Sequence, residues 1–383
     1  MSKDQNEEST RIPRRNFVTG LIGLAAGAAI LPAHANTDPA AAANAPGNTD
    51  TPKNLKGRID VHTHYIPEDY RKALIAAGHS KPSGMPGIPS WSVEQHLSVM
   101  DKLGIQTSML SISAPGLHFG DDQAACKMAR YCNEEGAKAV KAHPDRFGLF
   151  AVTPLPDVEG ALREIDYAFD VLGADGIVME TNFHGLYLGD EKLERVFAAI
   201  NRRQGTLFIH PTNPHCPCCQ DTTALQPLNY PYPMMEFIFE TTRAVFNLIL
   251  SGTLERYPDI KVIVPHAGAA VPLLAERAAA FGAFGVGHQK DKKLHESLRR
   301  LYYDLAGFPV PVALDALLHV ADPSHILYGS DWPFTPEALA IKLVADLDNA
   351  TQITSAMHKA FMRENALAIF PRLAKKQSDL ASN

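Results

Sequence analysis

The chain has 383 residues, of which 45% are hydrophobic and 20% are charged. These values are ordinary for a globular protein and are sufficient for a large core. The formal net charge of −6 argues against a nucleic-acid-binding surface, because phosphate binding needs clustered Lys and Arg. No apolar stretch is long enough to cross a membrane as a stable helix.

The first 35 residues have the pattern of an export signal. RRNFV at 14–18 resembles a twin-arginine core, an apolar run follows over 21–31, and AHA at 33–35 forms a small-residue cleavage site. We therefore expect a twin-arginine-type signal peptide over 1–35 and an exported, periplasmic protein. A disordered N-terminus with arginines present by chance is the alternative. A flexible linker is expected over 36–55 and a short tail over 376–383.

Short β-rich apolar runs then alternate with stretches of helical periodicity. Helices are predicted between the runs, for example over 92–103, 122–142, 158–172 and 191–204. The predicted strands cover 58–64, 107–113, 147–153, 176–181, 206–211, 261–268, 302–307 and 326–333. Eight strands, each followed by a crossover helix, predict a closed parallel (β/α)8 barrel, the TIM-barrel fold, over 56–375.

Polar side chains gather at the carboxyl-terminal ends of these predicted strands. A barrel enzyme builds its active site at that face, where the loops after the strands converge. The residues concerned are His62, His64, Ser111, Ser113, Thr153, Glu180, His210, His266, Asp304 and Asp331. Two long connections, 65–91 and 212–233, are expected to form lids or pocket walls at the same face.

Four of these residues form a predicted metal site. His62 and His64 stand two residues apart on one strand, so both side chains point to the same face. His210 ends the fifth predicted strand and Asp331 the eighth. Three imidazoles and one carboxylate suit a single divalent ion, zinc as our first expectation and manganese as our second, with a position open for water or substrate. A His-x-His pair alone is more often structural or solvated, and it gains weight here from the other strands.

Several motifs surround the predicted ligands. They are LERYP at 254–258, VPHAG at 264–268, ILYGSDWP at 326–333 and ENAL at 364–367, together with SISAPG at 111–116 and DLAGFP at 304–309. Over about 58–370 they resemble the amidohydrolase superfamily, in the branch of aminocarboxymuconate-semialdehyde decarboxylase. The last two motifs are more similar to 6-methylsalicylate decarboxylases.

The resemblance implies a mononuclear metal-dependent lyase that releases carbon dioxide without oxidation. It implies His266 as the catalytic histidine, which suits proton handling because its reference pKa is near neutrality. Asp331 is expected to take part in the proton transfer besides binding the metal. Binuclear relatives carry a carboxylated lysine at the end of the fourth strand, where this chain has Glu180. The family also implies a homodimer.

Three residues are candidates for binding the substrate: Arg277, His184 and Glu180. Residues 91–101 lack the arginines that grip a second carboxylate in the muconate-semialdehyde enzymes, which favours an aromatic hydroxy acid with one carboxylate, such as a 6-methylsalicylate-like acid. Arg277 matches an arginine that the family can donate across a dimer interface, and it is equally well an ordinary helix-surface residue. His184 lies in a loop after the fourth strand. Glu180 and Asp304 could each orient a ligand histidine or cap a helix.

Other interpretations of the same residues remain open at this point. A metal-dependent hydrolase of a lactone, ester or amide would use the same ligands, since fold and ligands do not determine chemistry. An exported binding protein without turnover is disfavoured, because it has no need of His266 beside a filled metal site. Cys216, Cys218 and Cys219 are expected in a structural lid rather than among the metal ligands, with a disulfide to a more distant cysteine as the alternative.

Overall fold

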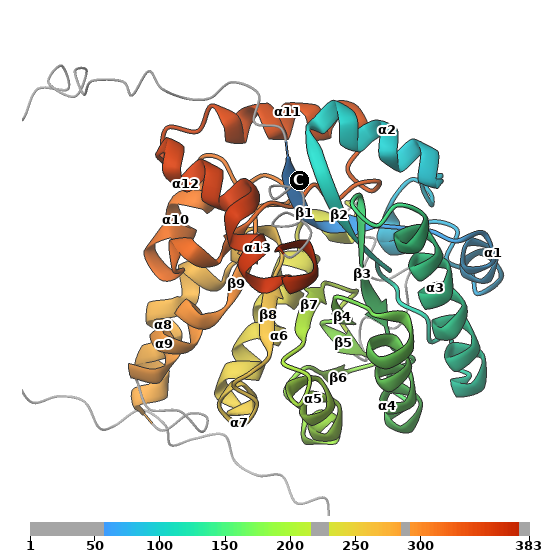
Figure 1. The fold of residues 1–383 in the computed structure, drawn as a ribbon. Helices are drawn as coiled ribbons and strands as arrows, with labels where there is room; N and C mark the ends of the chain where they lie inside the picture. Colours follow the sequence, from blue (N-terminus) through green and yellow to red (C-terminus); the bar gives the residue numbers. More distant parts are fainter. Residues whose placement is uncertain (1–56, 216–229, 285–291, 375–383) are drawn as a thin grey trace, which may run out of the picture. The chain divides into compact units, whose positions relative to one another are not determined.

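The computed structural model describes residues 57–215, 230–284 and 292–374. Within them, eight parallel strands form one sheet in the order β1-β2-β3-β4-β7-β8-β9-β10, and the helices surround it (Figure 1). The strands are β1 (Arg58–His64), β2 (Ile105–Ser111), β3 (Phe147–Val152), β4 (Gly176–Glu180), β7 (Thr206–His210), β8 (Lys261–Val264), β9 (Tyr302–Asp304) and β10 (Ile326–Leu327). A separate antiparallel pair, β5 (Asn182–Phe183) and β6 (Leu186–Tyr187), follows β4. The predicted (β/α)8 barrel is confirmed.

The barrel closes where β1 meets the segment after β10. The amide of Val61 donates to the carbonyl of Tyr328 at 3.0 Å, and the amide of His64 donates to the carbonyl of Trp332 at 2.8 Å. One more bond, from the amide of Asp331 to the carbonyl of His62 at 2.8 Å, ties a predicted ligand at one end of the barrel domain to another at the opposite end. This closing seam is therefore part of the predicted metal site.

The strands are buried on both faces, as in other parallel barrels. Every residue of β1, β3, β4 and β7 is buried, so the apolar runs that predicted them are explained by packing inside the barrel and under the helices. The later strands are shorter than predicted. β8 ends at Val264 because Pro265 has no amide proton to continue the ladder, and His266–Gly268 forms a 3₁₀ turn instead.

The helices cover the outside of the barrel (Figure 1), and several begin after a residue whose side chain caps the first turn. The side chains of Ser92, Asp121 and Asp157 accept bonds from the first turns of α2, α3 and α4. The helices are α1 (Glu68–Ala76), α2 (Val93–Leu103), α3 (Asp122–Ala142), α4 (Val158–Tyr167), α5 (Glu194–Asn201), α6 (Glu236–Leu250), α7 (Thr253–Arg256), α8 (Val271–Ala283), α9 (Lys292–Arg300), α10 (Val312–Val320), α11 (Glu337–Asp348), α12 (Ser355–Lys359) and α13 (Asn365–Ile369). Short 3₁₀ or π segments occupy Pro82–Gly84, Ala168–Leu172, Glu191–Leu193, Tyr232–Met234, Pro323–His325 and Ala360–Glu364.

Parts of the sequence-based predictions fall outside the described residues. The signal peptide, the linker, the C-terminal tail and the three cysteines Cys216, Cys218 and Cys219 all do so. The connection 65–91 is described, and it contains α1 and a 3₁₀ turn rather than only a loop. In the described part of the chain, no helix is both long and apolar enough to span a membrane.

Candidate metal centre and active site

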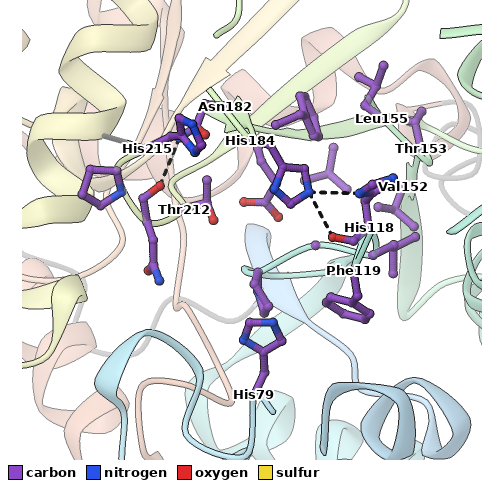
Figure 2. A pocket seen from close by; sticks show the side chains of 18 residues that line it. His79, His118, Phe119, Val152, Thr153, Leu155, Asn182, His184, Thr212 and His215 are labelled. Carbon is purple, nitrogen blue, oxygen red and sulfur yellow. Dashed lines mark hydrogen bonds between the residues drawn. The ribbon is translucent and has the colours of Figure 1, made fainter. Parts of the chain in front are cut away.

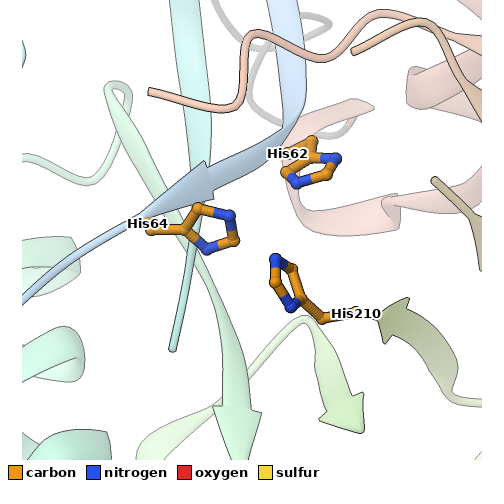
Figure 3. Close-up of side chains that lie close together, drawn as sticks. All are labelled: His62, His64 and His210. Carbon is orange, nitrogen blue, oxygen red and sulfur yellow. The ribbon is translucent and has the colours of Figure 1, made fainter. Parts of the chain in front are cut away.

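Three histidines from two distant strands meet at the carboxyl end of the barrel. His62 and His64 come from β1 and His210 from the end of β7, and their rings face a common point (Figure 3). One nitrogen of each lies within 4.8 Å of the others, and ligand atoms of His62, His266 and Asp331 are equally close to one another. The structure therefore brings together all four predicted ligands and His266.

Two of the three histidines have a buried nitrogen without a partner at this point, whereas Nε2 of His210 lies 3.3 Å from the hydroxyl oxygen of Ser113. Nε2 of His62 and Nε2 of His64 are buried and have no hydrogen bond, although Oδ1 of Asp331 lies 3.5 Å and 3.2 Å from them. A buried polar atom without a partner is costly, so native proteins rarely leave one unsatisfied. A divalent cation between these atoms would bind both nitrogens and the carboxylate. The residues fit such an ion, and we refer to His62, His64, His210 and Asp331 as the metal centre.

Neighbouring groups determine which nitrogen of His62 and of His64 is available to bind a metal ion. Nδ1 of His62 lies 2.9 Å from Oδ2 of Asp304, and a carboxylate can only accept, so His62 donates there. The hydroxyl of Ser111 donates to the carbonyl of Thr63, so its oxygen accepts from Nδ1 of His64 at 2.9 Å. In both histidines the lone pair of Nε2 is thereby directed at the centre, which is the arrangement of metal-binding histidines.

The electrostatics of the centre favour a positive charge. Burial alone lowers the pKa of His62, but the carboxylates of Asp304 and Asp331 outweigh it and raise that pKa to about 9. Burial lowers the pKa of His64 to about 3. For Asp331 burial raises the pKa, but the nearby imidazole of His64 and the charge of His62 outweigh burial and hold it below its usual value. The two buried carboxylates therefore favour a positive charge between these side chains.

The backbone at the centre adopts left-handed conformations at residues other than glycine. The φ angles are 57° at His266, 53° at Ala267, 57° at Ala269 and 57° at Asp331. Such residues each cost on the order of 1–3 kcal/mol and persist where surrounding contacts hold them, often at functional sites. Here Oδ1 of Asp304 accepts the amide of His266 at 3.0 Å, so one carboxylate positions both His62 and His266.

His266 stands beside the predicted ligands. Its ring centroid lies 5.1 Å from that of His62, and its Nδ1 has no hydrogen bond in the protein. Burial and the charge of His62 lower the pKa of His266 to about 4. A neutral imidazole with a free nitrogen can accept or relay a proton at this position.

The metal centre opens into a cavity of about 660 Å³ with largely apolar walls. Its polar residues are Ser83, Ser113, His210, His266, Asp331 and Thr335. Its larger apolar residues are Met85, Met234, Phe237, Ile238, Phe308, Phe334 and Leu339. Among the described lining residues only Asp331 carries a formal charge when the histidines are neutral. We call this space the apolar cavity.

Two predicted substrate-binding residues, Glu180 and His184, line a different and smaller hollow of about 190 Å³. Figure 2 shows it with His79, His118, His184 and His215 around it, and we call it the histidine hollow. Glu180 is also close to the metal centre, because its Oε2 lies 3.6 Å from Nδ1 of His210. Burial raises the pKa of Glu180. The geometry places Glu180 behind a predicted ligand and His184 away from His266.

The third candidate, Arg277, lies on the exposed side of α8. Its guanidinium stands 5.2 Å from the ring centroid of Phe281, and it lines neither the apolar cavity nor the histidine hollow. A role of Arg277 in substrate binding stays a prediction that depends on a second chain.

Asp60 is a buried neighbour of the metal centre that sequence reasoning did not single out. Its Oδ1 accepts the amide of His62 at 3.1 Å and the amide of Ser330 at 3.0 Å, so it joins the two halves of the seam beside the centre. Burial raises the pKa of Asp60 to about 7. Its position on a wholly buried strand, two residues before His62, was the available indication.

Comparison with known proteins agrees with this geometry. The model of the amidohydrolase family matches residues 59–372. The chain belongs to the amidohydrolase family. Among curated members, the 6-methylsalicylic acid decarboxylase of Aspergillus aculeatus is 37% identical over 332 residues, covering 84% of this chain and 98% of that protein. The predicted family resemblance is thus confirmed.

Solved structures of family members have the same fold. The crystal structure of an amidohydrolase II aligns with a TM-score of 0.77 at 32% identity, covering 82% of this chain and 100% of that one. The 5-carboxyvanillate decarboxylase of Sphingomonas paucimobilis aligns with a TM-score of 0.73 at 25% identity, covering 83% and 99%. The amidohydrolase barrel therefore accounts for nearly all of the described chain.

Proposed function

We propose that this amidohydrolase is a metal-dependent, nonoxidative decarboxylase of an aromatic hydroxy acid such as a 6-methylsalicylate-like substrate. The observation that carries the proposal is the metal centre, with His266 beside it, at the floor of a cavity whose walls are apolar and uncharged. Two curated relatives named 6-methylsalicylic acid decarboxylase are 37% and 36% identical to this chain. These names favour the lyase over the hydrolase that the ligand set alone left open.

The reaction exchanges a carboxyl group for a proton on one ring carbon. A bound divalent ion would supply charge stabilisation and orientation for the substrate oxygens. A proton from solvent is delivered to the ring carbon that bears the carboxylate, and His266 and Asp331 would relay it there. The carbon–carbon bond then breaks, its electron pair restores the aromatic ring, and carbon dioxide leaves. The apolar walls keep water from the ring during this exchange.

A direct assay tests the activity. Metal-loaded protein is incubated with salicylate, 6-methylsalicylate and dihydroxybenzoates labelled at the carboxyl carbon, and released carbon dioxide is counted. We expect release from at least one hydroxybenzoate, and loss of release in His266→Ala with its metal content retained. Absence of release across the panel, combined with turnover of lactones or amides, would establish the hydrolase instead.

The proposed ion is zinc, with manganese as the second candidate. The support is the ligand chemistry, since three imidazoles and one carboxylate with a position open for substrate suit zinc and also accommodate manganese. Metal analysis of the protein as purified, followed by removal with a chelator and reconstitution with each ion alone, distinguishes the two. Full activity restored by manganese and not by zinc would reverse the assignment.

The proposed assembly is a homodimer. Helices α6, α8 and α10 pack together and expose large apolar side chains, among them Phe239 at 46%, Leu273 at 73%, Phe281 at 49% and Val312 at 72%. Exposed apolar side chains on neighbouring helices are a feature of interaction surfaces. Sedimentation of the full chain should give twice the monomer mass, and Leu273→Glu should shift it toward the monomer. A monomeric wild-type protein would remove the proposal.

We also propose that the chain is exported through the twin-arginine route to the periplasm. The support is the sequence pattern of residues 1–35 alone. Cell fractionation of the full chain should place the protein in the periplasm, and replacing Arg14 and Arg15 together with lysine should retain it in the cytoplasm. Equal distributions for the two chains would contradict export by this route.

A further inference from the structure

The apolar cavity extends well beyond the space that a benzene ring needs. Its volume is about 660 Å³, whereas a cavity of about 150 Å³ holds a benzene molecule. Volumes of about 300–1,000 Å³ are typical of pockets for much larger ligands. A methyl-substituted ring at the metal centre would therefore leave most of the cavity without a ligand.

The unused part of the cavity is suited to an uncharged apolar group. Phe237, Ile238 and Leu339 come from α6 and α11 and face the same space as the metal centre. No lysine, arginine or glutamate lies among the described lining residues. A charged substituent there would lose its hydration without gaining a partner, which is costly. An alkyl chain would instead bury its surface favourably.

The cavity also has a direction. His210, His266 and Asp331 mark its polar end, while Met234 and Phe308 are each 72% exposed and mark an apolar rim. A substrate whose carboxylate lies at the polar end must direct its other ring positions toward the apolar walls and this rim. A chain attached to the ring can therefore extend along the walls toward solvent.

We infer that the preferred substrate is a salicylate-type acid whose ring carries an apolar chain of several carbons, bound by Phe237, Ile238, Phe308 and Leu339. The inference rests on the proposed decarboxylase function and adds the substrate class to it. Each buried methylene should raise kcat/KM about threefold to fourfold, mainly by lowering KM, because the chain is bound equally in the ground state and the transition state.

A homologous series of substrates tests the inference on the metal-loaded full chain. Carbon dioxide release and the dissociation constant are measured for 6-methyl-, 6-propyl- and 6-pentylsalicylate. We expect kcat/KM to rise about tenfold from methyl to propyl and about a hundredfold from methyl to pentyl, with matching gains in binding. Release from the methyl compound with a flat or falling series would overturn the inference and leave the proposed function standing. No release from any member would overturn the proposed function, and the binding series would then decide whether the apolar chain is recognised.

A matched pair of variants locates the chain on the proposed wall. Ile238 lines the apolar cavity. Ile341 on α11 is 44% exposed and lines neither the apolar cavity nor the histidine hollow. The ratio of kcat/KM for the pentyl to the methyl substrate should fall at least threefold in Ile238→Asn and stay unchanged in Ile341→Asn. The ratio is measured within each protein, so partial loss of folded enzyme cancels. An unchanged ratio in Ile238→Asn would exclude this wall as the chain-binding surface.

Discussion

Two groups of histidines lie at the carboxyl end of the barrel, and they differ in what their ring nitrogens contact. In the metal centre, Nε2 of His62 and Nε2 of His64 are buried without a hydrogen bond. In the histidine hollow, His118 uses both nitrogens, with Nε2 2.9 Å from Asp122 and Nδ1 3.0 Å from His184 (Figure 2). His184 is in addition exposed to solvent.

The comparison shows that location at the active end of a barrel does not by itself distinguish a metal ligand. Both groups follow strand ends, and both bring imidazoles close together. The two groups differ in whether they contain buried ring nitrogens without a hydrogen-bond partner. A cation can replace the missing partner only at such nitrogens. Variants of these and neighbouring buried groups test and extend this distinction, beginning with the largest expected effect.

The largest difference is expected between a ligand and a histidine of the hollow. His62→Ala should lose bound metal and reduce carbon dioxide release by more than about a hundredfold, since even groups that only orient a ligand affect metal affinity or activity 10–100-fold. His184→Ala should keep its metal content and activity within about twofold. Elemental analysis and the release assay on both variants check this. Metal loss in His184→Ala would remove the distinction between the two groups.

His266 should separate chemistry from metal binding. His266→Gln preserves the size and polarity of the side chain but cannot exchange a proton near neutral pH. We expect kcat to fall by about 10²–10⁴-fold, the usual contribution of a positioned acid or base, with metal content unchanged. Steady-state kinetics beside metal analysis give both values. A variant with full kcat would show that Asp331 alone handles the proton.

Asp304 and Glu180 should differ although both are buried carboxylates near ligand histidines. Asp304 lies 2.9 Å from Nδ1 of His62, whereas Glu180 lies 3.6 Å from Nδ1 of His210. Asp304→Asn should weaken metal affinity 10–100-fold, and Glu180→Gln should weaken it less than about threefold. Competition with a chelating dye measures both affinities. Equal losses would show that the longer contact also orients its histidine.

His96 is a buried histidine whose Nδ1 has a hydrogen-bond partner. We expect its replacement to change the stability of the protein and not its metal content. Trp91 donates to Nδ1 of His96 at 3.2 Å, and burial followed by the charge of Arg146 lowers its pKa from 6.5 to about 3. As the pH falls, His96 therefore takes up a proton in the unfolded chain before it does so in the folded chain. The contribution of neutral His96 to the free energy of unfolding is complete above pH 6.5 and is lost as the pH falls toward 3. The slope is at most about 1.4 kcal/mol per pH unit.

His96→Gln removes this titration without removing the side chain. The free energy of unfolding, measured in urea on metal-loaded protein, should therefore fall less between pH 7 and pH 5 in the variant than in the wild type. Parallel curves would show that His96 does not exclude a proton in the folded state.

Periodicity and strand order were enough to predict the barrel and to predict which side chains meet at its carboxyl end. The bounds predicted over 58–64 and 122–142 agree with β1 and α3 at both ends, because a wholly buried strand and a capped amphipathic helix leave clear patterns. The strand predicted over 261–268 was too long, because Pro265 has no amide proton for the ladder and the chain turns at His266–Gly268. The proximity of His62, His64, His210 and Asp331 could be predicted because strand ends of one barrel must share a face.

Tertiary packing determined what the sequence pattern left open. His184 was considered for substrate contact from its loop position, but the β5–β6 hairpin places it in the histidine hollow. The apolar cavity is built from segments that no local pattern connects, such as α6, the loop after β9 and the start of α11. The contact of Asp304 with His62 likewise joins residues 242 positions apart.

The metal centre spans the seam between β1 and the segment after β10, so binding of a cation there should stabilise the closed barrel. His62 and Asp331 sit on opposite sides of the seam and are tied by a single bond between their backbones. An ion shared by both side chains links the beginning and the end of the folded domain, so only the closed barrel can hold it. A hundredfold excess of ion over its dissociation constant would stabilise that closed form by about 2.7 kcal/mol. Local unfolding of β1 or of the segment after β10 would then release the ion before the rest of the fold is lost.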